Sequence, residues 1–146
     1  MKKIVVVVAL ICCAIDCSAK DASSMTGADL VAGNAQKKSG YSEAQLQSLS
    51  KALKGRELTF ENGKIDSVSK DEDDGHVTAM ISFAAPESGL FHPDFMVHAT
   101  FSDRATAKFV EKLDEGTKVK SLKGRVHYNA DFFMFFELKD ARLEVK

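Results

Sequence analysis

Two apolar, β-prone stretches between residues 116 and 139 constrain the fold of this chain more than any other feature. They are separated by residues 129–131, Asn-Ala-Asp, which are typical of a tight turn, so an antiparallel hairpin is expected. In the second stretch, alternation places four apolar side chains on one face of a strand: Phe132, Met134, Phe136 and Leu138. Phe133 and Phe135 point the other way, so both faces of this strand should be covered near its beginning.

The first of the two stretches predicts a bulge and a bend. Val119 and Leu122 are out of phase, whereas apolar or small residues recur at every second position from Leu122 onward. One extra residue near Lys120 and Ser121 explains this slip, as a β-bulge does. Gly124 inside the strand indicates a close backbone approach or a sharp bend. Strands that coil in this way are typical of a small closed barrel.

The N-terminal segment has the organisation of a secretory signal peptide. Lys2 and Lys3 precede an apolar run at residues 4–15, and small residues allow cleavage after Ala19. The run is too short for an ordinary membrane-spanning helix. We therefore expect residues 1–19 to be a signal peptide and the protein to be periplasmic or secreted.

All three cysteines of the chain lie in this N-terminal segment. The mature protein is therefore expected to contain no disulfide, reactive thiol or cysteine-ligated metal. A lipid anchor at Cys17 is the rival interpretation, although the preceding Ala-Ile-Asp fits a lipidation signal poorly. The formal net charge of the 146-residue chain is −1, which excludes a global basic field that would attract nucleic acid.

The remaining sequence divides into a lead-in, a helix and one domain. Residues 20–40 are small and polar and predict a flexible lead-in with a short helix around 28–35. Residues 41–54 predict an amphipathic helix that lies on the domain, with Gly55 as its stop. The apolar stripe of this helix consists of Leu46, Leu49 and Leu53. Residues 55–146 are enough for one domain with its own core.

Three further strands are expected before the hairpin. Residues 56–69 are interpreted as one long strand bent at Gly63, with an Asn-Gly hairpin as the alternative. Residues 76–84 and 95–101 alternate cleanly between apolar and polar. The acidic residues 70–75 (KDEDDG) are interpreted as a solvated hairpin tip and not as a cation loop, because they lack the ligand spacing of an EF-hand.

A second helix is expected over residues 102–115. Its apolar side would consist of Ala105, Phe109, Val110 and Leu113. The resulting order of strand, strand, strand, helix, strand, strand is that of the OB-fold, a five-stranded Greek-key barrel. The predicted fold class is therefore mainly β: an OB-fold barrel with an N-terminal helix.

Three groups of spaced residues carry a resemblance to a known family. They are Leu113-x-x-Gly116-x-x-Val119, Leu122-x-Gly124-x-Val126 and Leu138-x-Asp140-Ala141-x-Leu143. This pattern resembles the OB-fold family called tRNA-anticodon-binding-like, although the extra residue near Ser121 departs from its tightest form. The resemblance implies a barrel fold and a small exported bacterial protein. The family name does not imply tRNA binding, so a site has to be argued from this chain's own residues.

The candidate binding site is the outer face of the second and third strands, where OB-folds bind their ligands. This face carries His76, Thr78, Met80, Ser82, Met96, His98 and Thr100. The adjoining loop adds Leu90 and Phe91, which either contact a partner or plug the end of the barrel. The face has no Lys, Arg or stacking aromatic residue, which argues against nucleic acid and favours a protein, peptide or small ligand.

The sequence shows no catalytic signature. The mature chain has no cysteine, no Gly-x-Ser-x-Gly elbow and no Ser/His/Asp pattern, so we expect neither an enzyme nor a cofactor. His76 and His98 could share a metal ion if their strands are neighbours, but two solvated histidines are the favoured interpretation, and no metal site is predicted. The expected function is a non-catalytic binding module of the cell envelope. The alternatives are a structural or accessory envelope domain and the binding of single-stranded nucleic acid.

Overall fold

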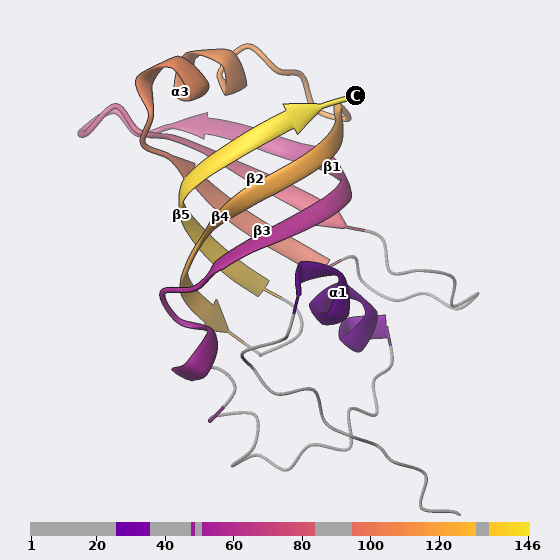
Figure 1. Cartoon of the computed structure of the whole chain (residues 1–146). Coiled ribbons are helices and arrows are strands. Elements are labelled where there is room, and N and C mark those ends of the chain that lie inside the picture. Colours follow the sequence, from indigo (N-terminus) through magenta and orange to yellow (C-terminus); the bar gives the residue numbers. More distant parts are fainter. Residues whose placement is uncertain (1–25, 36–47, 49–50, 84–94, 131–134) are drawn as a thin grey trace, which may run out of the picture.

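Five strands close into a barrel in the computed structural model, which describes residues 26–35, 48, 51–83, 95–130 and 135–146 (Figure 1). The elements are α1 (Gly27–Ala35), β1 (Glu57–Lys70), β2 (Val77–Phe83), β3 (Phe95–Phe101), α3 (Arg104–Val110), β4 (Lys118–Ala130) and β5 (Phe135–Val145). The order around the barrel is β1-β2-β3-β5-β4, and β4 pairs with β1 to close it. β3 and β5 are parallel, and the other described pairs are antiparallel. This is the OB-fold topology, so the predicted fold class is confirmed.

β1 is one long bent strand, as predicted. Its first half pairs with β4 and its second half with β2. Asn62 at φ 61° and a register shift at residues 65–67 change the direction of the strand between these halves. Gly63 is needed at the bend because a Cβ there would lie 2.6 Å from Cε1 of Phe83. The bend lets a single strand belong to two neighbouring sides of the barrel.

β4 and β5 form the predicted antiparallel pair, and the predicted bulge is present. The tight turn expected at residues 129–131 is wrong, because Asn129 and Ala130 still belong to β4 and pair with Phe136 and Phe135. Between Val119 and Ser121, β4 advances two residues while β5 moves only from Val145 to Glu144. The extra residue is therefore Lys120, which explains the change of phase seen in the sequence.

Two further positions shape this pair of strands. Gly124 makes the predicted close approach, because a Cβ there would lie 3.0 Å from the Cβ of Leu138. Asp140 has a positive φ of 51° and lies at a register shift, after which Ala141 and Leu143 occupy the inner face. Residues 131–134 and the side chain of Phe135 lie outside the described residues, so the expected two-sided burial there stays a prediction.

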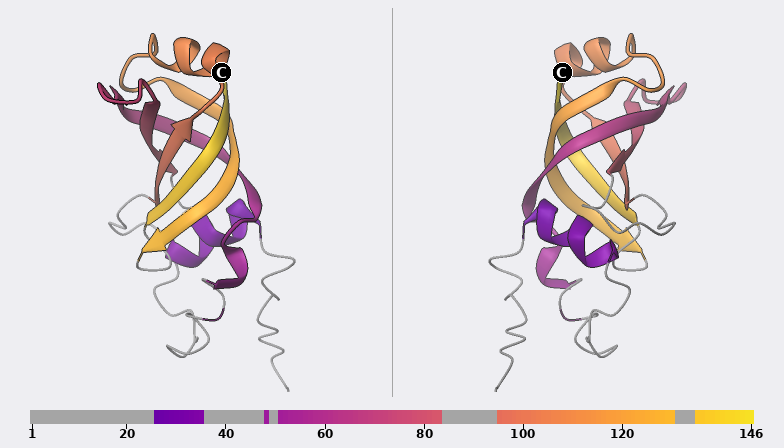
Figure 2. Two further views of the ribbon diagram at one scale, coloured as in Figure 1. Left: turned by 90° about the vertical axis from the view of Figure 1, so that its left-hand side faces the viewer. Right: turned by 90° about the vertical axis from the view of Figure 1, so that its right-hand side faces the viewer.

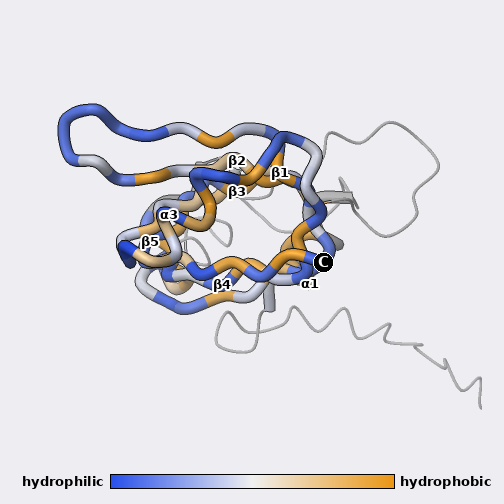
Figure 3. Tube along the Cα trace, turned by 90° about the horizontal axis from the view of Figure 1, so that it is seen from above, coloured by the Kyte–Doolittle hydropathy of each residue, from blue (hydrophilic) through white to orange (hydrophobic). Residues whose placement is uncertain are grey.

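Inward-facing residues of all five strands fill the barrel. Figure 3 shows the alternation of hydrophobic and hydrophilic residues along the strands. The inward positions predicted for β2 and β3 are at most 1% exposed: Val77, Ala79, Ile81, Phe83, Phe95, Val97, Ala99 and Phe101. The ring of Phe60 lies 5.4 Å from that of Phe83 and 5.5 Å from that of Phe95. Phe136 lies 5.4 Å from Phe95, so four aromatic rings form the centre of the core.

The helices α3 and α1 lie towards opposite ends of the barrel (Figures 1 and 2). α1 confirms the short helix expected around residues 28–35. It begins with a capping box, in which Asp29 N donates to Oγ1 of Thr26 at 3.2 Å and Thr26 N donates to Oδ2 of Asp29 at 2.9 Å. Leu30 and Val31 are buried and belong to the core, which the sequence interpretation did not predict.

α1 approaches β1 at Gly27. A Cβ on this glycine would overlap the carbonyl oxygen of Thr59 and lie 2.9 Å from Cδ1 of Phe60. Only a residue without a side chain allows the first turn of the helix to rest on the backbone of the strand.

The helix predicted at residues 41–54 lies largely outside the described residues. Residues 51–53 are helical, Leu53 is fully buried, and Gly55 ends the segment at φ 81°, as expected for its stop. The predicted signal peptide and the rival lipid anchor at Cys17 also lie outside the described residues.

The apolar side predicted for α3 is wrong in part. Phe109 is 44% exposed and Ala105 is exposed. The residues that face the barrel are Ala107, Val110 and Leu113. Within α3 the backbone bonds are of the ordinary α-helical kind, from Ala107 N to Asp103 O and from Glu111 N to Ala107 O. Ala107 and Val110, three residues apart, therefore share the side that packs on the barrel, and Ala105 and Phe109 lie off it. The helix ends at Val110, earlier than the expected residue 115, and Leu113 follows in a tighter turn closed by the bond from Leu113 N to Val110 O.

Candidate functional site

The outer face of β2 and β3 brings six of the seven predicted strand residues together. The antiparallel register places them in three directly opposed pairs: Thr78 with Thr100, Met80 with His98, and Ser82 with Met96. Opposed residues of an antiparallel pair have Cβ atoms about 5 Å apart, so each pair presents one continuous contact area. The three pairs contain no Lys, Arg, Asp or Glu.

Exposure varies along this face. Met96 is 37% exposed, while Met80 and His98 are partly exposed. Ser82 is only 6% exposed, and its hydroxyl donates to Oδ1 of Asp66 at 3.1 Å. The expectation that Ser82 lies open on the face is therefore wrong, because its hydroxyl is used within the barrel wall. The accessible part of the face consists of the other five paired residues.

His76 lies outside this block, in the turn before β2. Its backbone N–H donates to Oδ1 of Asp74 at 2.8 Å, and its Nε2 lies 3.7 Å from Oδ2 of the same residue. His98 is opposite Met80, and His76 comes four residues before Met80. The two histidines are therefore roughly 13 Å apart along the strand direction. The two histidines do not meet, which overturns the idea of a shared metal ion. No group of three or more His, Cys, Asp or Glu able to hold a metal occurs in the described part of the chain.

The acidic residues 70–75 form a hairpin tip between β1 and β2, as predicted. Asp71 N donates to His76 O at 2.8 Å, and Gly75 N donates to Asp71 O at 3.0 Å. Oδ1 of Asp71 accepts from Asp73 N at 2.8 Å. Carboxylates of the tip thus accept bonds from their own backbone, as in Asx-turns, and do not converge on a common point. The loop residues Leu90 and Phe91 lie outside the described residues.

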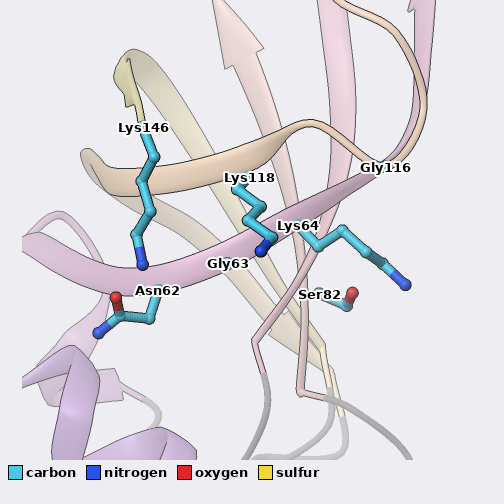
Figure 4. A pocket seen from close by; sticks show the side chains of 7 residues that line it. All are labelled: Asn62, Gly63, Lys64, Ser82, Gly116, Lys118 and Lys146. Atoms are coloured by element: carbon cyan, nitrogen blue, oxygen red, sulfur yellow. The ribbon is translucent and has the colours of Figure 1, made fainter.

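The strands β4 and β5 carry a basic surface that the sequence interpretation missed. At one end of it lies a cavity of about 330 Å³, lined by Asn62, Gly63, Lys64, Ser82, Gly116, Lys118 and Lys146. In Figure 4 the side chain of Lys146 extends towards Asn62, Lys118 lies over Gly63, and Lys64 points away. The sequence feature that could have revealed this surface lies in β4, where residues 118–125 (KVKSLKGR) contain four cations and no acidic residue.

Two carboxyl groups have pKa values below their ordinary range, and both lie at the surface. The hydrogen bond from Lys123, 2.8 Å long, lowers the pKa of Glu57, and the charges of Arg142 and Arg125 add to this effect. Hydrogen bonds from the backbone N and the hydroxyl of Thr106 lower the pKa of Asp103, the N-cap of α3. Both carboxyl groups are held in the charged form by structural contacts.

Comparison with known proteins finds neither a matching family model nor a matching curated protein. Among solved structures, the chain is similar to a Klebsiella pneumoniae lipoprotein to which nucleic-acid binding is ascribed, with 18% identity and a TM-score of 0.46 over 71% of this chain and 89% of that one. It is also similar to RecG bound to a three-way DNA junction, with 21% identity and a TM-score of 0.39 over 64% of this chain and 12% of that one. Neither likeness assigns a ligand to this chain. Across the described residues, no helix is both long and apolar enough to span a membrane.

Proposed function

We propose that this chain is a non-catalytic binding module of the cell envelope that recognises a protein, peptide or small ligand. The observation that carries the proposal is the register of β2 and β3, which aligns three uncharged pairs on the face that OB-folds use for binding. Met96 on this face is one of two large hydrophobic residues of the described chain that are exposed. Thioether side chains adapt to differently shaped partners. The hydroxyl of Thr100 can supply a hydrogen bond, whereas that of Thr78 already forms one with the hydroxyl of Ser69 at 2.8 Å.

A non-catalytic role is supported by the chemistry of the same face. Its three pairs contribute hydroxyls, thioethers and one imidazole, and no carboxylate or thiol stands among them. A hydroxyl and an imidazole can act together as nucleophile and base, but the residue directly opposite His98 is Met80, whose thioether has no proton to give up. The face is better suited to contact than to turnover.

Two finer parts of the proposal rest on the sequence. Export to the envelope is supported by the signal-peptide pattern of residues 1–19. Membership of the tRNA-anticodon-binding-like family is supported by the positions of its pattern, since its apolar strand residues point inward in this barrel. Those residues are Val119, Leu122, Val126, Leu138, Ala141 and Leu143.

Affinity capture from an envelope extract tests the proposed face. The mature chain, residues 20–146, is compared with Met96→Glu and with Phe109→Glu. Phe109 is the matched control because it is the other exposed large hydrophobic residue and lies on α3. We expect Met96→Glu to weaken capture of a specific partner at least tenfold, because a charge is placed on the contact surface, while Phe109→Glu captures normally. Equal capture by all three proteins, or equal loss in both variants, would rule out this face.

A further inference from the structure

Cations lie directly opposite one another at three places along β4. Lys118 is opposite Lys64 on β1. Lys123 is opposite Arg142, and Arg125 is opposite Lys139, on β5. Like charges in directly opposed positions destabilise a sheet, so three such pairs along one strand call for a reason other than stability.

Only part of this charge is neutralised within the protein. Lys123 forms an ion pair with Glu57 at 2.8 Å, Lys120 with Glu144 at 3.2 Å, and Lys64 with Asp66 at 3.6 Å. Five cations of the same surface form no ion pair in the part of the chain that the structure describes: Lys118, Arg125, Lys139, Arg142 and Lys146. Glu57 stands directly opposite Arg125 in the ladder between β1 and β4, and the charges of Arg125 and Arg142 lower its pKa, so this carboxylate offsets part of their charge.

The basic residues form a long, narrow strip. β4 and β5 run side by side, and Arg125 comes seven positions after Lys118, which is roughly 23 Å of strand. At the Lys118 end the strip opens into the cavity that also contains Lys146 (Figure 4). A strip of this length matches a linear chain of anionic groups better than a single small anion.

The strip lacks the second feature that single-stranded nucleic acids need. Binding proteins of that class combine a positive groove with aromatic side chains on which bases stack. The residues at 118–125 and 139–146 contain no aromatic side chain. Arginine and lysine alone recognise sulfate, phosphate and carboxylate groups by charge and hydrogen bonding.

We propose that the outer surface of β4 and β5 binds an acidic polysaccharide. The chain of anionic groups would follow β4 from the Lys118 cavity to the pair of Arg125 and Lys139. The cavity at the Lys118 end is also lined by Ser82 of the β2 and β3 face, but the cations of the strip lie on other strands, so substitutions at Arg125 and Arg142 test this proposal separately from the first. Binding would be salt-sensitive, because it releases counterions from a polyanion.

Titration of the full chain with heparin as the probe tests the proposal, with a single-stranded oligonucleotide of equal charge as the second arm. The test variant is Arg125→Gln/Arg142→Gln, which removes one cation from each of two opposed pairs. The control, Lys51→Gln/Lys54→Gln, removes the same charge at exposed positions outside the strip. We expect heparin affinity to fall at least tenfold in the test variant and to stay unchanged in the control.

Thermal unfolding checks that the test variant is folded. Three outcomes would overturn the proposal. The first is unchanged heparin affinity in the test variant. The second is an equal loss in the control, which would show that overall charge and not the strip binds heparin. The third is oligonucleotide binding as tight as heparin binding, which would assign the surface to nucleic acid.

Discussion

Replacing Gly27 with alanine tests whether one close backbone contact holds α1 on the barrel. A Cβ at this position would overlap the carbonyl oxygen of Thr59 and lie 2.8 Å from its carbonyl carbon. Thr59 is paired with Lys123 in the ladder between β1 and β4, so the strand cannot yield easily and the helix has to move. Alanine is intrinsically the better helix former, so propensity alone would stabilise the variant. A loss of stability therefore reports the displacement of α1.

The expected loss of stability follows from the side chains of α1 that are buried in the core. Leu30 is 0% and Val31 7% exposed. Burying side chains of this kind stabilises a protein by about 1.5–3 kcal/mol each, so complete detachment would cost about 3–6 kcal/mol. The unfolded chain is partly compact and the helix can shift without leaving, so we expect about 3 kcal/mol. For a domain of this size that corresponds to a melting temperature lowered by roughly 10 °C.

Urea unfolding of Gly27→Ala, Leu30→Ala and the double variant separates this mechanism from general strain. If the alanine displaces α1, Leu30 has already left the core, and the double variant should lose little more than the larger single loss. Gly75→Ala is the control, because nothing lies within 4 Å of its added Cβ and its φ of 72° costs about 1 kcal/mol. Additive losses, or a Gly27→Ala variant as stable as the original chain, would refute the reasoning.

Three further predictions concern the core, α3 and metals. Phe60→Ala should lower the free energy of unfolding in urea by about 3–5 kcal/mol, because the ring of Phe60 packs against three others. Phe60→Leu should lower it by less than about 1.5 kcal/mol, and equal losses in the two variants would contradict this packing. The lowered pKa of Asp103 means that its charge stabilises the fold above the unfolded pKa and that this contribution is lost as pH falls through the folded pKa. Asp103→Asn keeps a capping oxygen but removes the charge, so the variant should be less stable than the original chain at pH 7. This difference in stability should shrink towards pH 3, where the carboxyl group of the original chain becomes protonated, and a constant difference would argue against a charge effect. Millimolar zinc or calcium should leave the melting temperature unchanged, because His76 and His98 are far apart and the tip carboxylates bond their own backbone; a rise would reveal a metal site.

Local patterns predicted the strands well because alternation is a property of each strand by itself. The inward positions of β2 and β3 follow directly from the period of two, and the slip between Val119 and Leu122 correctly located the bulge at Lys120. The bend at Gly63 and the stop at Gly55 were likewise visible as glycines at breaks in a pattern. The face of α3 was mispredicted because apolar character was taken as the guide, whereas Phe109 is apolar and still lies off the side that packs on the barrel.

The candidate site was predictable only in part. Alternation placed Met80 and His98 on the outer side of their strands, but it could not tell which residues stand opposite each other. That depends on the register, which separated His76 from His98 and aligned Met80 with His98. The burial of Ser82 depended on Asp66, a residue of the neighbouring strand. The cations of β4 were visible in the sequence, yet their like-charged partners on β1 and β5 were not.

The amino-acid sequence by itself determined which residues of the strands face the core, where strands break and bulge, and the order of elements that makes an OB barrel. These properties depend on neighbours a few residues apart, and steric and hydrophobic preferences act at that range. Only the tertiary structure decided that α1 packs on the backbone of Thr59 at Gly27 and that Arg125 stands opposite Lys139 in the sheet. Contacts of this kind join residues distant in the chain, and they are set by barrel closure and strand register.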